Sequence, residues 1–154
     1  MIIDNKLLNR LSLKSLESSR KRTNYNFHRS DDDLLQRMLN VVQPGSYVQP
    51  HKHENPDKRE AFVILKGRML VVLFNDSGNI IEHHILDRNS DVYGIEISPG
   101  TYHTIVALEK DTCVYEVKDG PYNPDDDKHF ADWAPSEEQT EEGQFYLKKL
   151  VDLA

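Results

Sequence analysis

Three histidines and one glutamate lie at spacings that suit a shared metal ion. His51 and His53 are one residue apart, and residues two apart on a strand point to the same face, so their imidazoles project together. Glu60 follows the loop "ENPDKR", where a hairpin would return its carboxylate to the histidine pair. His103 follows the turn "SPGTYH" at the start of another apolar run. The four side chains could therefore converge at one mouth of a barrel.

The chemistry of this set points to a divalent transition metal. Neutral imidazole and carboxylate suit Zn, Fe, Ni, Mn or Co, and no thiolate is placed to select among these ions. Four protein ligands on a larger coordination sphere leave positions for water or substrate, as catalytic sites require. A lone cysteine in mid-strand is usually a core residue, so Cys113 is not counted among the ligands.

Short apolar runs, which would position these residues, extend from about residue 34 to residue 118. They are rich in Val, Ile, Tyr and Phe and are separated by turn residues such as Pro-Gly and Asp-Ser-Gly-Asn. Regularly spaced short strands of this kind predict an all-β protein, a sandwich or barrel of antiparallel sheet. The seven runs are "LLQRMLNVV", "AFVILKG", "MLVVLFND", "NIIEHHIL", "VYGIEIS", "YHTIVAL" and "TCVYEVK".

Segments of different character flank the predicted barrel core of residues 34–118. Residues 1–33 predict an arm with one or two short helices and an extended stretch. Residues 119–154 predict an acidic loop and then a helix, because Ser136 and Gln139 have the spacing of a capping box. We expect the whole chain, 1–154, to form a single domain.

Charge and composition exclude some classes of partner. The net charge of −7 comes entirely from residue 119 onward, where ten acidic and three basic residues lie. Nucleic-acid binding needs a basic surface, so no such partner is expected. No run approaches the roughly 20 apolar residues of a membrane span, and the N-terminus lacks the apolar centre of a secretory signal. A single cysteine fits a reducing compartment, so we expect a cytoplasmic protein without a membrane partner.

The stretch "RKRTNYNFH" alternates polar and aromatic residues with a period of two. One face would carry Tyr25 and Phe27, and the other a polar row of Arg22, Asn24, Asn26 and His28. The row is either the solvated side of an edge strand or a substrate-binding wall. In the second case Arg22 would meet a carboxylate or phosphate, and the asparagines would meet hydroxyls.

Tyr122 is the candidate catalytic residue. It lies between two prolines in "DGPYNP", which stiffen the loop and fix the position of the ring. The loop could cross the barrel mouth, with Tyr122 as a proton donor or substrate contact. Packing of Tyr122 on the outside of the barrel is the alternative.

These motifs resemble the two motifs of the cupin superfamily. The first is Gly45, five residues, His51, one residue, His53, six residues, Glu60, six residues and Gly67. The second is Gly94, then Pro99-Gly100, two residues and His103, with Ala107 where an asparagine is usual. The stretches "RKRTNYNFH", "QRMLNVVQPGSYVQPHKH" and "VKDGPYNPDDDKHFADWAP" are similar to the WbuC family of cupin-fold metalloproteins.

The resemblance implies a double-stranded β-helix, or jelly-roll barrel, with a divalent metal on the four matched residues. It also implies a link to surface-polysaccharide biosynthesis, but no established reaction. We therefore expect a small metal-dependent enzyme acting on a hydroxylated, anionic or neutral metabolite such as a sugar derivative, by isomerisation or epimerisation. The alternatives are a saccharide-binding or sensing protein without turnover and an iron-dependent dioxygenase. A homodimer is expected, because apolar residues of the N-terminal segment (Ile2, Ile3, Leu7, Leu8, Leu11) call for a covering surface.

Overall fold

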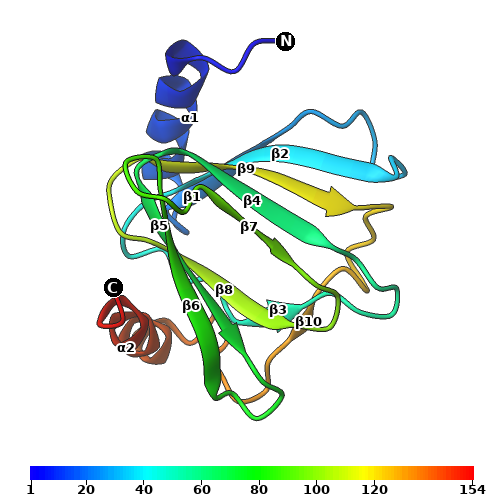
Figure 1. Cartoon of the computed structure of the whole chain (residues 1–154), viewed down its shortest axis with the longest axis vertical. Coiled ribbons are helices and arrows are strands. Elements are labelled where there is room, and N and C mark those ends of the chain that lie inside the picture. The colour runs from blue at the N-terminus through cyan, green and yellow to red at the C-terminus, as the bar shows by residue number, and fades with distance from the viewer.

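Two five-stranded antiparallel sheets dominate the computed structural model, which describes all residues from 1 to 154 (Figure 1). The strands are β1 (Arg22–Asn26), β2 (Leu35–Val42), β3 (His51–Lys52), β4 (Glu60–Lys66), β5 (Arg68–Phe74), β6 (Ile80–Asp87), β7 (Gly94–Ile97), β8 (Tyr102–Ala107), β9 (Thr112–Asp119) and β10 (His129–Phe130). Sheet one has the order β1-β2-β9-β4-β7, and sheet two the order β10-β3-β8-β5-β6. Because β9 lies between β2 and β4 and β8 between β3 and β5, the connections are those of a jelly roll. The predicted cupin double-stranded β-helix is confirmed.

The inner faces of the two sheets form the main core. All seven apolar runs form strands, and their inward residues meet between the sheets. This cluster holds Val42, Val48, Phe62, Ile64, Met69, Val71, Leu86, Ile97, Ile105, Ala107 and Val114. None of the four candidate ligands belongs to it, so the core does not depend on them for its apolar contacts.

Helix α1 (Asn5–Glu17) covers the outer face of sheet one. Its Leu7, Leu8 and Leu11 pack on Leu39, Val41 and Cys113, and Tyr25 and Phe27 lie against the same cluster. Sheet one is therefore buried on both faces around β2 and β9. These leucines are covered by the chain itself, so they offer no surface to a partner, whereas Met1 and Ile2 are exposed. The homodimer stays a prediction.

Helix α2 (Thr140–Val151) covers the outer face of sheet two, with Leu147 and Leu150 against Leu70, Val72 and Val106. It begins four residues after Ser136, later than the capping box predicts. The Ser136 N–H still donates to Oε1 of Gln139 (3.0 Å), but this bond closes a turn that precedes the helix. Neither α1 nor α2 has the length and apolar character needed to cross a bilayer.

Two glycines of the cupin motifs lie in turns next to β4 and β8, the strands that carry Glu60 and His103. Gly67 joins β4 to β5 with φ of 72°, and a Cβ there would lie 2.5 Å from Oγ1 of Thr112. Gly100 has φ of 73° in the turn that leads to His103. Both conformations are in the left-handed region, where other residues are strained.

The N-cap of α1 contributes to the stability of the N-terminal helix, and this contribution can be tested by mutation. Asp4 accepts a hydrogen bond from the Leu7 N–H through Oδ1 (2.9 Å). Asp4→Ala should lower the free energy of unfolding by about 1 kcal/mol, because it leaves that N–H without its cap. Urea denaturation measures the change. Asp4→Asn retains a capping oxygen and should stay close to the wild type; equal loss in both variants would contradict a capping role.

Candidate metal centre

The four predicted ligands meet between the two sheets. His51 and Glu60 are the first residues of β3 and β4, His53 directly follows β3, and His103 lies on β8. His51 and His103 are paired across β3 and β8. All four side chains are buried, and their ligating atoms lie within 4.8 Å of one another.

Backbone carbonyls orient the three imidazoles. Nδ1 of His51 lies 2.9 Å from the Gln49 carbonyl oxygen, and Nδ1 of His103 lies 2.9 Å from that of Thr101. Nδ1 of His53 donates to the carbonyl of Asp127. A carbonyl only accepts, so each ring carries its proton on Nδ1 and presents the lone pair of Nε2 to the centre.

The centre fits a cation because acceptors face one another there. Oε2 of Glu60 lies 2.8 Å from Nε2 of His103 and 3.4 Å from Nε2 of His53. With the protons on Nδ1, these three buried atoms have no donor among them. Buried polar atoms without partners are costly, and a divalent ion that accepts all their lone pairs removes that cost.

The ionisation states suit the same ion. Burial, then the positive charge of Lys128, holds the pKa of His51 well below its usual value. Burial by itself would raise the pKa of Glu60, but in the absence of the ion, hydrogen bonds and charge from His103 and His53, when these rings are protonated on Nε2, outweigh it and hold the pKa well below its usual range. Near neutral pH His51 is therefore a neutral imidazole and Glu60 a carboxylate, the forms that bind metals.

A polar cavity of about 380 Å³ opens beside the centre. His51, Glu60 and His103 are among its 22 lining residues, of which only six are hydrophobic. The four residues of the predicted polar row line the same cavity, and Tyr25 and Phe27 point away from it into the contact with α1. The cavity thus joins the polar row to the metal centre and suits a polar ligand better than an apolar one.

Within the polar row, Arg22 already has partners. Its guanidinium donates to both carboxylate oxygens of Glu137 (2.6 Å each) and to the Tyr47 carbonyl (2.8 Å). These bonds tie β1 to the segment before α2 and neutralise the charge of Arg22. Asn24 donates to Oδ1 of Asn26 (2.7 Å), so the two amides present one connected surface.

Tyr122 lies at the open side of the cavity. The residue is 38% exposed, and its ring lies over Nζ of Lys118, which is 5.7 Å from the ring centroid. Its backbone N–H donates to the Asp31 carbonyl (2.7 Å), which fixes the loop across the start of β2. Tyr122 therefore lines the cavity, and its catalytic role stays a prediction.

Sequence reasoning did not single out Glu116, a buried carboxyl group on the inner face of β9. Asn40 on β2 donates to its Oε2. Burial, followed by the neighbouring charge of Glu60 and a hydrogen bond with it, raises the pKa of Glu116 well above its usual range. The cavity therefore contains a neutral carboxylic acid beside a metal-binding carboxylate. The period-two pattern of "TCVYEVK" places Glu116 and Lys118 on one face of the strand, but it does not tell whether that face lines the site.

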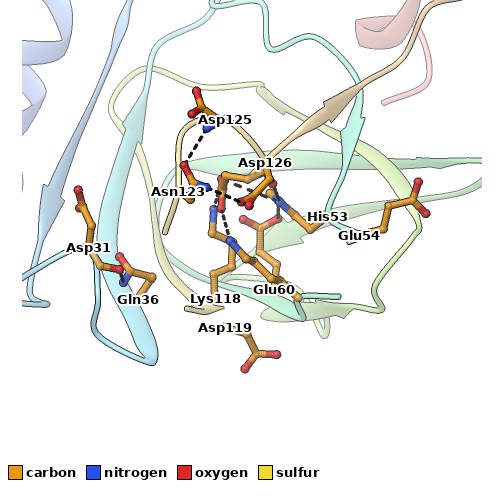
Figure 2. Close-up of polar contacts among 12 residues, drawn as sticks. Asp31, Gln36, His53, Glu54, Glu60, Lys118, Asp119, Asn123, Asp125 and Asp126 are labelled. Atoms are coloured by element: carbon orange, nitrogen blue, oxygen red, sulfur yellow. Dashed lines mark hydrogen bonds and ion pairs between the residues drawn. The ribbon is translucent and has the colours of Figure 1, made fainter. Parts of the chain in front are cut away.

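A second unexpected feature is a buried ion triad behind His53, which we call the Asp127 triad: Lys58, Asp127 and Lys118. Nζ of Lys118 lies 2.6 Å from Oδ2 of Asp127, and Nζ of Lys58 lies 3.1 Å from Oδ1. The Asp127 carbonyl is also the acceptor for His53. Figure 2 shows Lys118, Glu60 and His53 gathered against the loop that carries Asp126. This loop therefore contributes to the metal centre.

The remaining conspicuous residues lie outside the site. His83 and His84 are on β6, away from the cavity, and His84 pairs with Glu82 at 3.1 Å. His129 donates from Nε2 to the Glu54 carbonyl (2.7 Å), and Trp133 packs on Phe74. The last two contacts anchor the acidic loop to sheet two.

Comparisons with known proteins agree with this architecture. Residues 3–86 match the model of a domain of unknown function, DUF6016. No curated protein matches the chain. Among solved structures, the chain is similar to the capsular polysaccharide assembling protein CapF from Staphylococcus aureus (20% identity, TM-score 0.58), over 70% of this chain and 28% of CapF. It is also similar to KdgF from Halomonas sp. (22% identity, TM-score 0.52), over 68% of this chain and 83% of KdgF.

At these identities the structural likeness shows the fold. The chain spans less than a third of the length of CapF, and the DUF6016 description assigns no activity. The cupin fold is confirmed, whereas the more specific resemblance to the WbuC family stays a prediction.

Proposed function

We propose that this chain, which belongs to the DUF6016 family, is a metal-dependent cupin enzyme acting on a hydroxylated small metabolite such as a sugar derivative. The observation that carries the proposal is the meeting of two features in one cavity: a buried set of three histidines and a carboxylate, and a lining rich in polar side chains. We propose isomerisation or epimerisation as the reaction and the cytoplasm as its place.

The polar row supports a hydroxylated substrate. Asn24 and Asn26 each offer an amide donor and acceptor at the cavity, and Gln36 and Asn40 add two more amides from β2. Amide groups match neutral hydroxyls better than charged groups do. The likeness to CapF, which is described as a capsular polysaccharide assembling protein, agrees with a saccharide, as does the predicted WbuC resemblance.

Glu116 supports turnover rather than binding alone. Isomerisation and epimerisation move a proton between carbon and an acid–base group, and a neutral carboxyl at a cavity wall can hold or donate such a proton. A divalent ion on the three histidines and Glu60 would supply Lewis acidity toward a substrate oxygen. Tyr122, whose ring lies at the open side, is the second candidate for proton transfer.

The test combines metal analysis with a screen for products. Protein purified without added metal is analysed for its elements and then incubated with a panel of sugars, sugar phosphates and sugar nucleotides. We expect one transition metal per chain, and product formation that chelation abolishes and that Glu116→Gln lowers while metal content is unchanged. The exposed Glu138→Gln is the matched control, since it removes a carboxylate that does not line the cavity.

Other outcomes would identify the alternative functions. Metal-dependent binding of a saccharide without any product would indicate a binding or sensing protein. Oxygen consumption with iron as the bound metal would indicate a dioxygenase. Absence of bound metal, together with full turnover in chelator, would refute the proposal.

A further inference from the structure

Two of the cationic side chains at the cavity have no partner in the protein. The cavity is lined by four such side chains: Arg20, Arg22, Lys118 and Lys128. Arg22 is bound by Glu137 and Lys118 by Asp127, both at 2.6 Å. Arg20 and Lys128 take part in no ion pair and no side-chain hydrogen bond, and both are exposed where the cavity opens.

Both cations stand on anchored backbone. Arg20 lies in the turn between α1 and β1, and its carbonyl accepts a hydrogen bond from Oγ of Ser46 (2.6 Å). Lys128 lies between Asp127 of the buried triad and His129, which begins β10. Each side chain is therefore held at the cavity by the segment that carries it.

Lys128 lies close to the metal centre. The strand that follows it pairs with β3, with Phe130 opposite His51. Lys128 therefore lines the same cavity as His51.

The cavity carries little free negative charge to balance these cations. Of the carboxyl groups in its lining, Glu60 faces the candidate metal, Glu116 accepts a hydrogen bond from Asn40 and Asp127 lies between two lysines. Asp31 is the remaining one, and Figure 2 shows it apart from Glu60 and Lys118. With a divalent ion on the ligands, the cavity is positive, although the chain as a whole has a net charge of −7.

We propose that the substrate of this site carries an anionic group, a carboxylate or a phosphate, and that Arg20 and Lys128 bind it while the hydroxylated part extends to the metal centre. This proposal rests on the proposed function for the existence of a substrate. The sequence alone predicted Arg22 as the contact for an anion, but Arg22 is already paired with Glu137. We therefore assign that contact to Arg20 and Lys128, which have no ion-pair partner. An anion there gains two charge-assisted contacts.

Three sugars test the proposal on the metal-loaded protein by isothermal titration calorimetry. Glucose 6-phosphate and glucuronate carry the two candidate anions, and glucose is the uncharged probe. We expect one or both charged sugars to bind at least tenfold more tightly than glucose, because a hydrogen bond to a charged group is worth roughly ten- to a hundredfold in affinity. Their affinity should fall as salt is raised, since the contacts are exposed.

Paired variants assign the effect to the two residues. Arg20→Gln/Lys128→Gln should remove the preference for the charged sugars, and Arg10→Gln/Lys14→Gln, which removes the same charge from the exposed side of α1, should retain it. The proposal is overturned if neither charged sugar binds better than glucose, or if the preference survives in the first variant. A charge-dependent affinity without product formation upholds the anion site and counts against the enzymatic function only.

Discussion

The His51→Ala/His53→Ala double variant should purify without stoichiometric metal and should still fold. Two of the four ligands are removed, and both present unprotonated Nε2 atoms to the centre in the wild type. The loss of affinity should exceed the roughly 10- to 100-fold that follows removal of a single hydrogen-bonding partner of a ligand. The apolar core between the sheets contains neither residue, so circular dichroism should show the native sheet content.

A matched pair of histidines provides the control for this experiment. His83→Ala/His84→Ala removes two imidazoles from β6, outside the cavity, and should leave metal content unchanged. Elemental analysis after dialysis in metal-free buffer measures both proteins. Stoichiometric metal in the His51/His53 variant would show that the site is wrongly assigned.

The second large effect is expected from Asp127→Asn in the buried triad. The substitution keeps the shape of the side chain and the backbone carbonyl that His53 uses, but it removes the ion-pair partner of Lys118 and leaves the ammonium group of Lys58 buried without a counter-charge. Breaking a buried ion pair in this way costs about 3–5 kcal/mol. Urea denaturation in the presence of a chelator measures the loss separately from any change in metal binding.

Asp119→Asn is the control for charge removal. Asp119 pairs with Arg59, whose side chain is 67% exposed, and such surface pairs contribute about 0–1 kcal/mol. If the two variants lost equal stability, the Asp127 triad would not stabilise the fold.

The stability that the Asp127 triad contributes should depend on pH in a defined direction. Burial alone would raise the pKa of Asp127, but the charge of Lys118 and its hydrogen bond outweigh this, so the pKa lies below its usual value. A carboxyl whose pKa is lower in the folded state adds stability above its unfolded pKa, about 3.9, and loses it as pH falls through the folded value. The difference in free energy of unfolding between the wild type and Asp127→Asn should thus be constant near neutral pH and should shrink only below about pH 4.

The sequence could predict the barrel and the candidate ligands because both leave local patterns. Alternating apolar runs mark strands, and two histidines separated by one residue must share a face of a strand. The glycine spacing places the turns at Gly67 and Gly100, where the structure has positive φ. The strands, the histidine pair and the glycine turns each depend on residues that are close in sequence, so periodicity and spacing can predict them.

Glu116 and Lys118 could not be assigned to the cavity in this way, because β9 is covered on both faces. On β9 the face with Cys113 and Tyr115 packs against α1, and the opposite face carries Glu116 and Lys118 into the cavity. Both faces are buried, so alternation alone does not tell which one lines the site. Asp127 is beyond prediction for a different reason: its partner Lys58 is 69 residues away in sequence, and only the closed barrel brings them together.

The hydrogen bond from His53 to the Asp127 carbonyl couples docking of the acidic loop on the barrel to binding of the metal ion. Docking of the loop fixes the imidazole in the tautomer that binds the ion, so a docked loop raises the affinity for the metal. By thermodynamic reciprocity, the ion must favour the docked loop by the same free energy. A larger supply of metal would then increase the fraction of molecules in which the loop is docked on the barrel.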